Sequence, residues 1–130
     1  MNHSKQRDLI MDYLMGTKSH PTAEEVYNEV KLKEPNISLG TVYRNLNLLA
    51  DNNIIVRLHM KDGIDHFDAD TSEHYHFYCN CCSRVYDLDI KAPAAFNKCI
   101  ASKGDASGHK IEGAMVYFYG TCKGCALKTD

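Results

Sequence analysis

Residues 54–67 read IIVRLHM, KDG and IDHF, two short runs rich in apolar and β-branched residues on either side of a turn. The Asp62-Gly63 pair favours the left-handed backbone of a tight hairpin, so the stretch predicts two antiparallel strands joined there. Lys61 lies at the tip of this hairpin and Arg57 lies behind it, where both cations could reach phosphate groups.

Three helical segments precede the hairpin. Residues 4–15 place apolar side chains on one helical face, and Thr22 with Glu25 forms a capping box ahead of a second helix. Ser38 can cap a third helix, whose face opposite the apolar one is rich in hydrogen-bonding side chains. Three helices and a hairpin indicate a winged helix-turn-helix, whose third helix enters the major groove of DNA. Any other small helical domain with a hairpin remains the alternative.

The composition limits the kind of protein. The 130 residues carry a net charge of −2, with 44% hydrophobic and 25% charged residues, which is typical of an ordinary globular protein. No apolar run approaches the roughly 20 residues that span a bilayer, and the amino terminus does not resemble a signal peptide. We expect a cytoplasmic protein without membrane contact, whose DNA binding depends on a local basic patch. Six cysteines in a reducing compartment favour metal binding over disulfides.

Two Cys-x-x-Cys pairs, Cys79 with Cys82 and Cys122 with Cys125, predict one structural zinc ion. Each pair folds into a turn that directs two thiolates at one ion, and two pairs complete a tetrahedral sulfur site. A redox-active pair or an iron–sulfur cluster is the alternative. A site with four cysteine ligands has no open position for catalysis, so the zinc is expected to hold the fold.

A second group of candidate ligands surrounds His74-Tyr75-His76. Residues two apart on a strand project from one face, so both imidazoles can address one ion. Asp68 and Asp87 lie on either side in the sequence, and His20 lies in the first half. Mixed nitrogen and oxygen ligands suit Fe(II), Mn(II) or zinc. Surface or core histidines without a ligand role are the alternative reading.

We expect the chain to divide near Asp70, into residues 1–69 and a small α/β domain of residues 70–130. Strands at 75–78 and 85–88 flank the first cysteine pair, and residues 110–119 form a last strand that is apolar on both faces. One face of that strand is expected to meet a second subunit. Between the strands at 85–88 and 110–119 we expect a helix that begins at Pro93. Its apolar face is formed by Ala95, Phe96, Cys99 and Ile100.

Four stretches together resemble the ferric uptake regulator family: HPTAEEVY at 20–27, SLGTVY at 38–43, EHYHFYC at 73–79 and YGTCKGC at 119–125. The resemblance covers nearly the whole chain and is closest to the peroxide-responsive repressors. It implies an α+β homodimer on operator DNA, with an N-terminal winged helix-turn-helix followed by a dimerisation domain that holds the four-cysteine zinc. It also implies a regulatory Fe(II) or Mn(II) site that bridges the domains.

The family's regulatory ligands fall on His20, Asp68, His74, His76 and Asp87. In having Asp at position 87 the chain resembles the peroxide sensors of the family, since iron-uptake regulators usually carry Glu there. The resemblance implies that metal closes the two domains onto DNA. Peroxide then reacts with Fe(II), the resulting oxidant converts His20 or His74 to 2-oxo-histidine, and DNA is released. Mn(II) would support repression without sensing.

Ser38, Thr41, Tyr43 and Arg44 are the residues that we expect to face the major groove, beside Arg57 and Lys61 on the hairpin. Family members usually carry a further helix before the segment equivalent to Lys5, so base readout is expected to fall more heavily on the third helix here. No role follows from the sequence for His3, His59, His66 or His109. Cys81 is interpreted as a spare thiol and Cys99 as a core residue.

Two other functions compete with a peroxide sensor. One is an iron, manganese or zinc uptake regulator of the same family, without redox chemistry. The other is an enzyme such as a non-haem iron oxygenase with two histidines and a carboxylate. Five candidate ligands leave little room for dioxygen and a substrate, so we expect neither an enzyme nor a small organic substrate.

Overall fold

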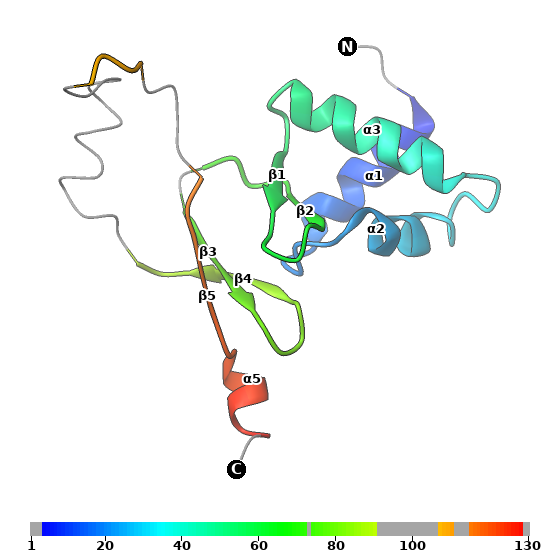
Figure 1. Ribbon diagram of the computed structural model, residues 1–130. Coiled ribbons are helices and arrows are strands. Elements are labelled where there is room, and N and C mark those ends of the chain that lie inside the picture. The colour runs from blue at the N-terminus through cyan, green and yellow to red at the C-terminus, as the bar shows by residue number, and fades with distance from the viewer. Residues whose placement is uncertain (1–3, 73, 91–106, 111–114, 129–130) are drawn as a thin grey trace. The chain divides into compact units, whose positions relative to one another are not determined.

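The computed structural model describes residues 4–72, 74–90, 107–110 and 115–128 of the chain. It is drawn in Figure 1. The chain divides into two compact units, residues 1–72 with 84–86 and residues 73–83 with 87–130. Among the described residues no helix is long and apolar enough to cross a membrane. The helix expected after Pro93, with Cys99 on its apolar face, lies outside the described residues.

Three helices form most of the first unit: α1 (Lys5–Gly16), α2 (Ala23–Val30) and α3 (Leu39–Asp51). The predicted capping box is confirmed, since Thr22 accepts from the backbone of Glu25 while the Glu25 side chain accepts from the backbone of Thr22. Ser38 caps α3 by accepting from the backbone of Thr41. The helices begin where the sequence predicted because local side chains satisfy their first free N–H groups.

A hairpin of β1 (Val56–His59) and β2 (Asp65–Asp68) follows α3 (Figure 1). The strands are antiparallel, with Leu58 opposite His66, and Gly63 adopts a φ of 81° in the turn. The first strand is shorter than the predicted 54–60, and the second has the predicted length but lies one residue later than 64–67, because pairing runs from position 56 to 59 and from 65 to 68. Ile55 and Phe67 are buried in the same core as the three helices. This arrangement is a winged helix-turn-helix.

A second sheet has the strand order β4-β3-β5, where β3 is Tyr75–Cys79, β4 is Val85–Leu88 and β5 is Tyr117–Gly120. Strands β3 and β5 belong to the second unit, whereas the first two residues of β4 are grouped with the first. Strands β3 and β5 are parallel, and their pairing starts at His76 with Tyr117. Of the strand predicted at 110–119, residues 117–119 lie in β5 and residues 115 and 116 are not in a strand, while 111–114 lie outside the described residues.

Cysteine side chains form the described core of the second unit. Cys79, Cys122 and Cys125 are buried together, with Phe77 packed against them. Gly120 passes so close to the Phe77 ring that an added Cβ would lie 3.4 Å from it. On β5, Phe118 and Tyr119 are 43% and 63% exposed. A metal ion held by the thiols can stabilise this cluster.

Candidate metal centres and DNA-binding surface

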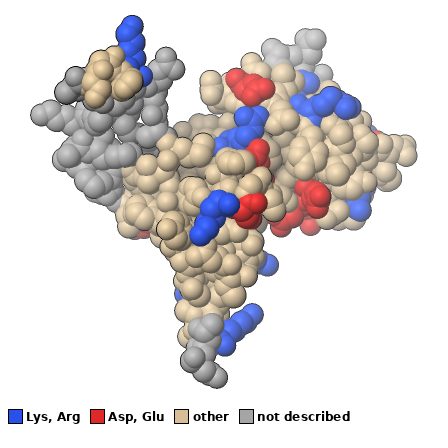
Figure 2. Space-filling view, in the orientation of Figure 1, with Lys and Arg blue, Asp and Glu red and all other residues tan. Residues whose placement is uncertain are grey.

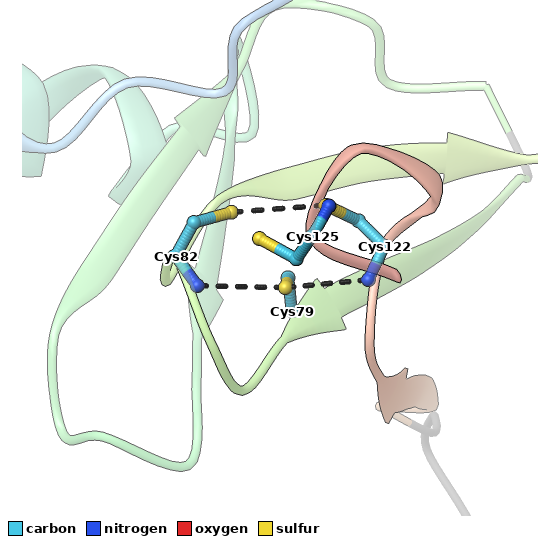
Figure 3. A group of neighbouring side chains, drawn as sticks. All are labelled: Cys79, Cys82, Cys122 and Cys125. Atoms are coloured by element: carbon cyan, nitrogen blue, oxygen red, sulfur yellow. Dashed lines mark hydrogen bonds between the residues drawn. The ribbon is translucent and has the colours of Figure 1, made fainter. Parts of the chain in front are cut away.

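The four cysteines of the two Cys-x-x-Cys pairs meet in the second unit. Their Sγ atoms all lie within 4.8 Å of one another, and Figure 3 shows the four side chains drawn together from the turn after β3 and from α5 (Lys123–Ala126). The Sγ atoms of Cys82 and Cys122 are 3.9 Å apart. Tetrahedral zinc with bonds of about 2.3 Å separates its sulfur ligands by about 3.8 Å. The group of thiols is therefore close to the size of a four-cysteine zinc site.

Backbone N–H groups support these sulfurs. The Cys79 Sγ accepts from the N–H of Cys82 and from that of Cys122, at 3.5 and 3.3 Å (Figure 3). These bonds lower the pKa of the Cys79 thiol to about 6, so it ionises readily. The Cys125 thiol has a raised pKa, because its hydrogen bonds to the thiols of Cys122 and Cys81 and its burial disfavour a second negative charge. A divalent cation removes that conflict.

Cys81 is exposed and lies outside the four-cysteine group. Ser83 adopts a φ of 62°, and its N–H donates to the Cys79 carbonyl, which closes the turn that brings Cys82 back to Cys79. The turn thus brings the thiols of positions 79 and 82 to one side, and the interpretation of Cys81 as a spare thiol stays a prediction.

Of the expected regulatory ligands, His20 and Asp68 lie together in the first unit. The His20 Nε2 is 3.3 Å from the Asp68 Oδ2, with only 3% and 12% of the two side chains exposed. The His20 Nδ1–H donates to the backbone carbonyl of Val85 at 3.2 Å. A hydrogen bond at Nδ1 fixes the tautomer that leaves Nε2 available as a metal ligand.

The sequence did not predict the backbone of His20. Its φ is 52°, in the left-handed region that residues other than glycine rarely adopt. Its carbonyl accepts from the Nδ1–H of His66 at 2.7 Å, and the next carbonyl, of Pro21, accepts from the Phe67 N–H at 2.9 Å. Residues 20 and 21 are therefore held by strand β2. The sequence could have indicated a role for His66, because side chains two apart on a strand lie on the same face and His66 is two residues before Asp68.

The remaining three expected ligands lie together in the second unit. One oxygen of Asp87, Oδ1, is 3.1 Å from the His74 Nε2 and 3.5 Å from the His76 Nε2. The two imidazole rings lie with their centroids 4.4 Å apart. Two imidazole nitrogens and a carboxylate that converge in this way form a ligand group for Fe(II), Mn(II) or zinc.

The residues nominated for groove contact lie at the start of α3. Ser38 caps the helix, and its hydroxyl also bonds that of Thr41 at 2.9 Å. The Arg44 Nη2 donates to the Thr41 hydroxyl at 2.9 Å, and Tyr43 is 44% exposed. The polar end of α3 is thus arranged by bonds among its own side chains, with Tyr43 accessible to a partner.

The Arg57 side chain, which the sequence predicted to reach phosphate groups, makes several contacts within the protein. Its Nη2 donates to Asn47 at 3.0 Å and to Asp51 at 3.3 Å, both on α3, and its Nε lies 3.8 Å from an Asp65 oxygen. The guanidinium therefore ties the hairpin to the third helix. Sequence reasoning also missed Arg7, whose Nε donates to the Asn45 side chain of α3 at 3.1 Å.

Charge on the first unit is mixed. On the face drawn in Figure 2, the described Lys and Arg side chains are interspersed with Asp and Glu. This face therefore shows no continuous basic patch among the described residues.

Comparison with known proteins identifies relatives along nearly the full chain. The profile of the ferric uptake regulator family matches residues 1–119. The chain is 32% identical to the peroxide operon regulator of Bacillus subtilis over 125 residues, which covers 96% of this chain and 84% of that protein. It is 37% identical to the peroxide-responsive repressor PerR of Staphylococcus epidermidis over 125 residues, covering 92% and 78%.

Solved structures share the fold. The Campylobacter jejuni peroxide stress regulator is 30% identical with a TM-score of 0.72, and the match covers 92% of this chain and 88% of that one. The Helicobacter pylori ferric uptake regulator has a TM-score of 0.77 at 24% identity, covering 97% and 83%.

Proposed function

The chain belongs to the ferric uptake regulator family, and we propose that it is a metal-dependent repressor that releases operator DNA when hydrogen peroxide oxidises a ligand histidine. The observation that carries this proposal is the convergence of His74 and His76 on one oxygen of Asp87. The resemblance associates Asp at that position with the peroxide-responsive members.

We propose that residues 1–69 bind DNA and residues 70–130 form a homodimer. Exposed aromatic side chains on β5 support dimerisation: Phe118 and Tyr119 project from opposite faces of the strand, and both would otherwise remain largely in water. The zinc held by Cys79, Cys82, Cys122 and Cys125 is structural in this proposal. It stabilises the turn after β3 and the start of α5, next to the strands that carry His76 and Asp87.

The regulatory ion is proposed to be bound by His20 and Asp68 from the first unit together with His74, His76 and Asp87 from the second. An ion that binds both groups favours whichever arrangement of the units brings them together. If that arrangement places the two α3 helices of a dimer one helical turn of DNA apart, the affinity for operator DNA depends on whether the metal is bound.

Bound Fe(II) would promote cleavage of hydrogen peroxide beside the imidazoles, with the histidine ring as the net donor of the two electrons that peroxide accepts. In net terms one peroxide oxygen is inserted at the ring carbon between the two nitrogens of His20 or His74, and the other leaves as water. The product, 2-oxo-histidine, is a poorer ligand, so the ion is lost and DNA is released. Mn(II) reacts less readily with peroxide and would support repression without this step.

The deciding experiment loads the zinc-containing protein with Fe(II), adds one equivalent of hydrogen peroxide, and maps oxygen addition by peptide mass spectrometry. We expect a gain of one oxygen on His20 or His74, with a parallel loss of operator binding. The Mn(II)-loaded protein is the control and should gain none. Unmodified histidines with operator binding intact would favour the second candidate, a metal-uptake regulator of the same family.

A further inference from the structure

His66, in the middle of β2, lies outside both groups of metal ligands, yet its side chain is buried with 4% exposed. A buried polar side chain requires a hydrogen-bond partner, and here the partner is the carbonyl of His20, 2.7 Å from the His66 Nδ1. We propose that His66 is a positioning residue for the regulatory metal site, because it holds His20 in the backbone conformation that directs its imidazole to Asp68. The inference rests on the proposed function above.

The conformation of His20 needs external support. A φ of 52° is disfavoured for a residue with a Cβ, and such a residue persists only where the surrounding structure holds it. Three contacts to β2 provide that support: the His66 bond to the His20 carbonyl, the Phe67 N–H bond to the Pro21 carbonyl, and the bridge between Thr22 and His66. Of these, only the first is made by a side chain to His20 itself.

The two residues of β2 that address His20 are spaced by two positions and project from the same face. His66 contacts its carbonyl, and Asp68 contacts its Nε2. Metal binding would take the Nε2 and the Asp68 carboxylate, but it leaves the carbonyl untouched. The His66 bond can therefore persist in the metal-free and the metal-bound protein, and it preorganises the ligand instead of competing with the ion.

Loss of this bond should act on metal affinity more than on folding. Outer-shell partners of ligand histidines typically change metal affinity by about 10- to 100-fold. Without the His66 imidazole, the His20 carbonyl loses its bond to β2 while the backbone contacts of Pro21 and Thr22 remain, so φ of His20 is expected to relax and to turn the imidazole away from Asp68. The four-cysteine zinc should not change, since its ligands form a separate group in the second unit.

The test compares Mn(II) affinity in zinc-loaded full chains, measured from the free Mn(II) signal by electron paramagnetic resonance. His66→Leu removes the donor, and His66→Asn has nearly the same shape as leucine but keeps an N–H donor near the Nδ1 position. We expect Mn(II) affinity at least tenfold weaker in His66→Leu and mostly restored in His66→Asn. His66→Ala replaces the leucine variant if the latter does not fold.

Leu58→Ala is the matched control, because Leu58 pairs with His66 across the hairpin and is buried without contacting His20 through a polar group. It should lower the thermal midpoint but leave Mn(II) affinity within threefold of the wild type. Equal Mn(II) affinity in wild type and His66→Leu, or an equal loss in Leu58→Ala, would overturn the inference alone. A wild-type protein that binds no Mn(II) beyond its zinc would overturn the proposed function as well.

Discussion

The His20 Nε2 and the Asp68 Oδ2 face one another at 3.3 Å in a nearly water-free setting. Burying a charged carboxylate destabilises the folded protein unless a cation or a hydrogen bond offsets the lost hydration. The imidazole provides one such partner and a divalent ion would provide a stronger one, so the pair is suited to exchange a direct contact for shared metal coordination.

Removing the Asp68 charge should therefore weaken the regulatory site. Asp68→Asn keeps the size of the side chain but supplies a neutral and weaker ligand, so we expect Mn(II) affinity to fall at least tenfold with zinc content unchanged. Asp70→Asn is the control, since Asp70 is exposed and accepts from the Ser72 N–H at 2.9 Å. Isothermal titration of the zinc-loaded proteins measures both, and equal affinities in the two variants would contradict the assignment.

The cysteine cluster makes a second prediction. Cys122→Ser should lose bound zinc, from about one ion per chain to near none, and should lower the unfolding temperature of the second unit because its core depends on the ion. Cys81→Ser should keep both, since Cys81 lies outside the four-cysteine group. Elemental analysis with thermal unfolding checks the pair. A Cys81→Ser protein without zinc would show that the ligand set is misassigned.

The sequence predicted those features that local chemistry determines. The Thr22 capping box and the Ser38 cap follow from side chains within three residues, and the two cysteine pairs follow from their spacing. The positive φ of His20 could not be predicted, because it is held by His66, 46 positions away in the sequence. Residues 115 and 116 were predicted in a strand but do not lie in one, because an apolar run indicates burial whereas the paired strand determines where a strand begins.

Substitution of Asp87 offers a test of peroxide sensitivity. Asp87→Glu lengthens the side chain by one methylene, so the oxygen that now lies 3.1 Å from His74 and 3.5 Å from His76 must shift relative to both imidazoles. We expect metal-activated operator binding to persist while sensitivity to peroxide falls several-fold. The measurement is the peroxide concentration that releases half of the operator DNA from the Fe(II)-loaded protein. An unchanged concentration would mean that this position does not tune the reaction.

Arg57 and Lys61 should differ in salt dependence. Each phosphate contact contributes about 0.9 to the slope of log affinity against log salt. The Arg57 guanidinium is held by Asn47 and Asp51, so Arg57→Ala should reduce operator affinity by loosening the hairpin while the slope stays constant. Lys61→Ala should lower the slope by about one. Fluorescence anisotropy at several salt concentrations separates the two, and a lower slope for Arg57→Ala would instead place its guanidinium on a phosphate.

Ser38 combines a structural and a proposed recognition role, which two substitutions can separate. Its hydroxyl accepts from the Thr41 N–H at 3.1 Å, so Ser38→Ala should destabilise the protein by about 1 kcal/mol. Aspartate caps helices as well as serine does, and its charge suits the amino end of a helix, so Ser38→Asp should retain the free energy of unfolding.

DNA binding should follow the opposite order. If the start of α3 lies in the major groove, the carboxylate of Ser38→Asp meets the field of the phosphates, and like-charge juxtaposition costs several kcal/mol. We expect operator affinity to fall at least tenfold in Ser38→Asp but only slightly in Ser38→Ala, with chemical denaturation and anisotropy measured on the same preparations. If both variants bound the operator as the wild type does, α3 would enter DNA by another part of its surface, and Ser38 would be a helix cap alone.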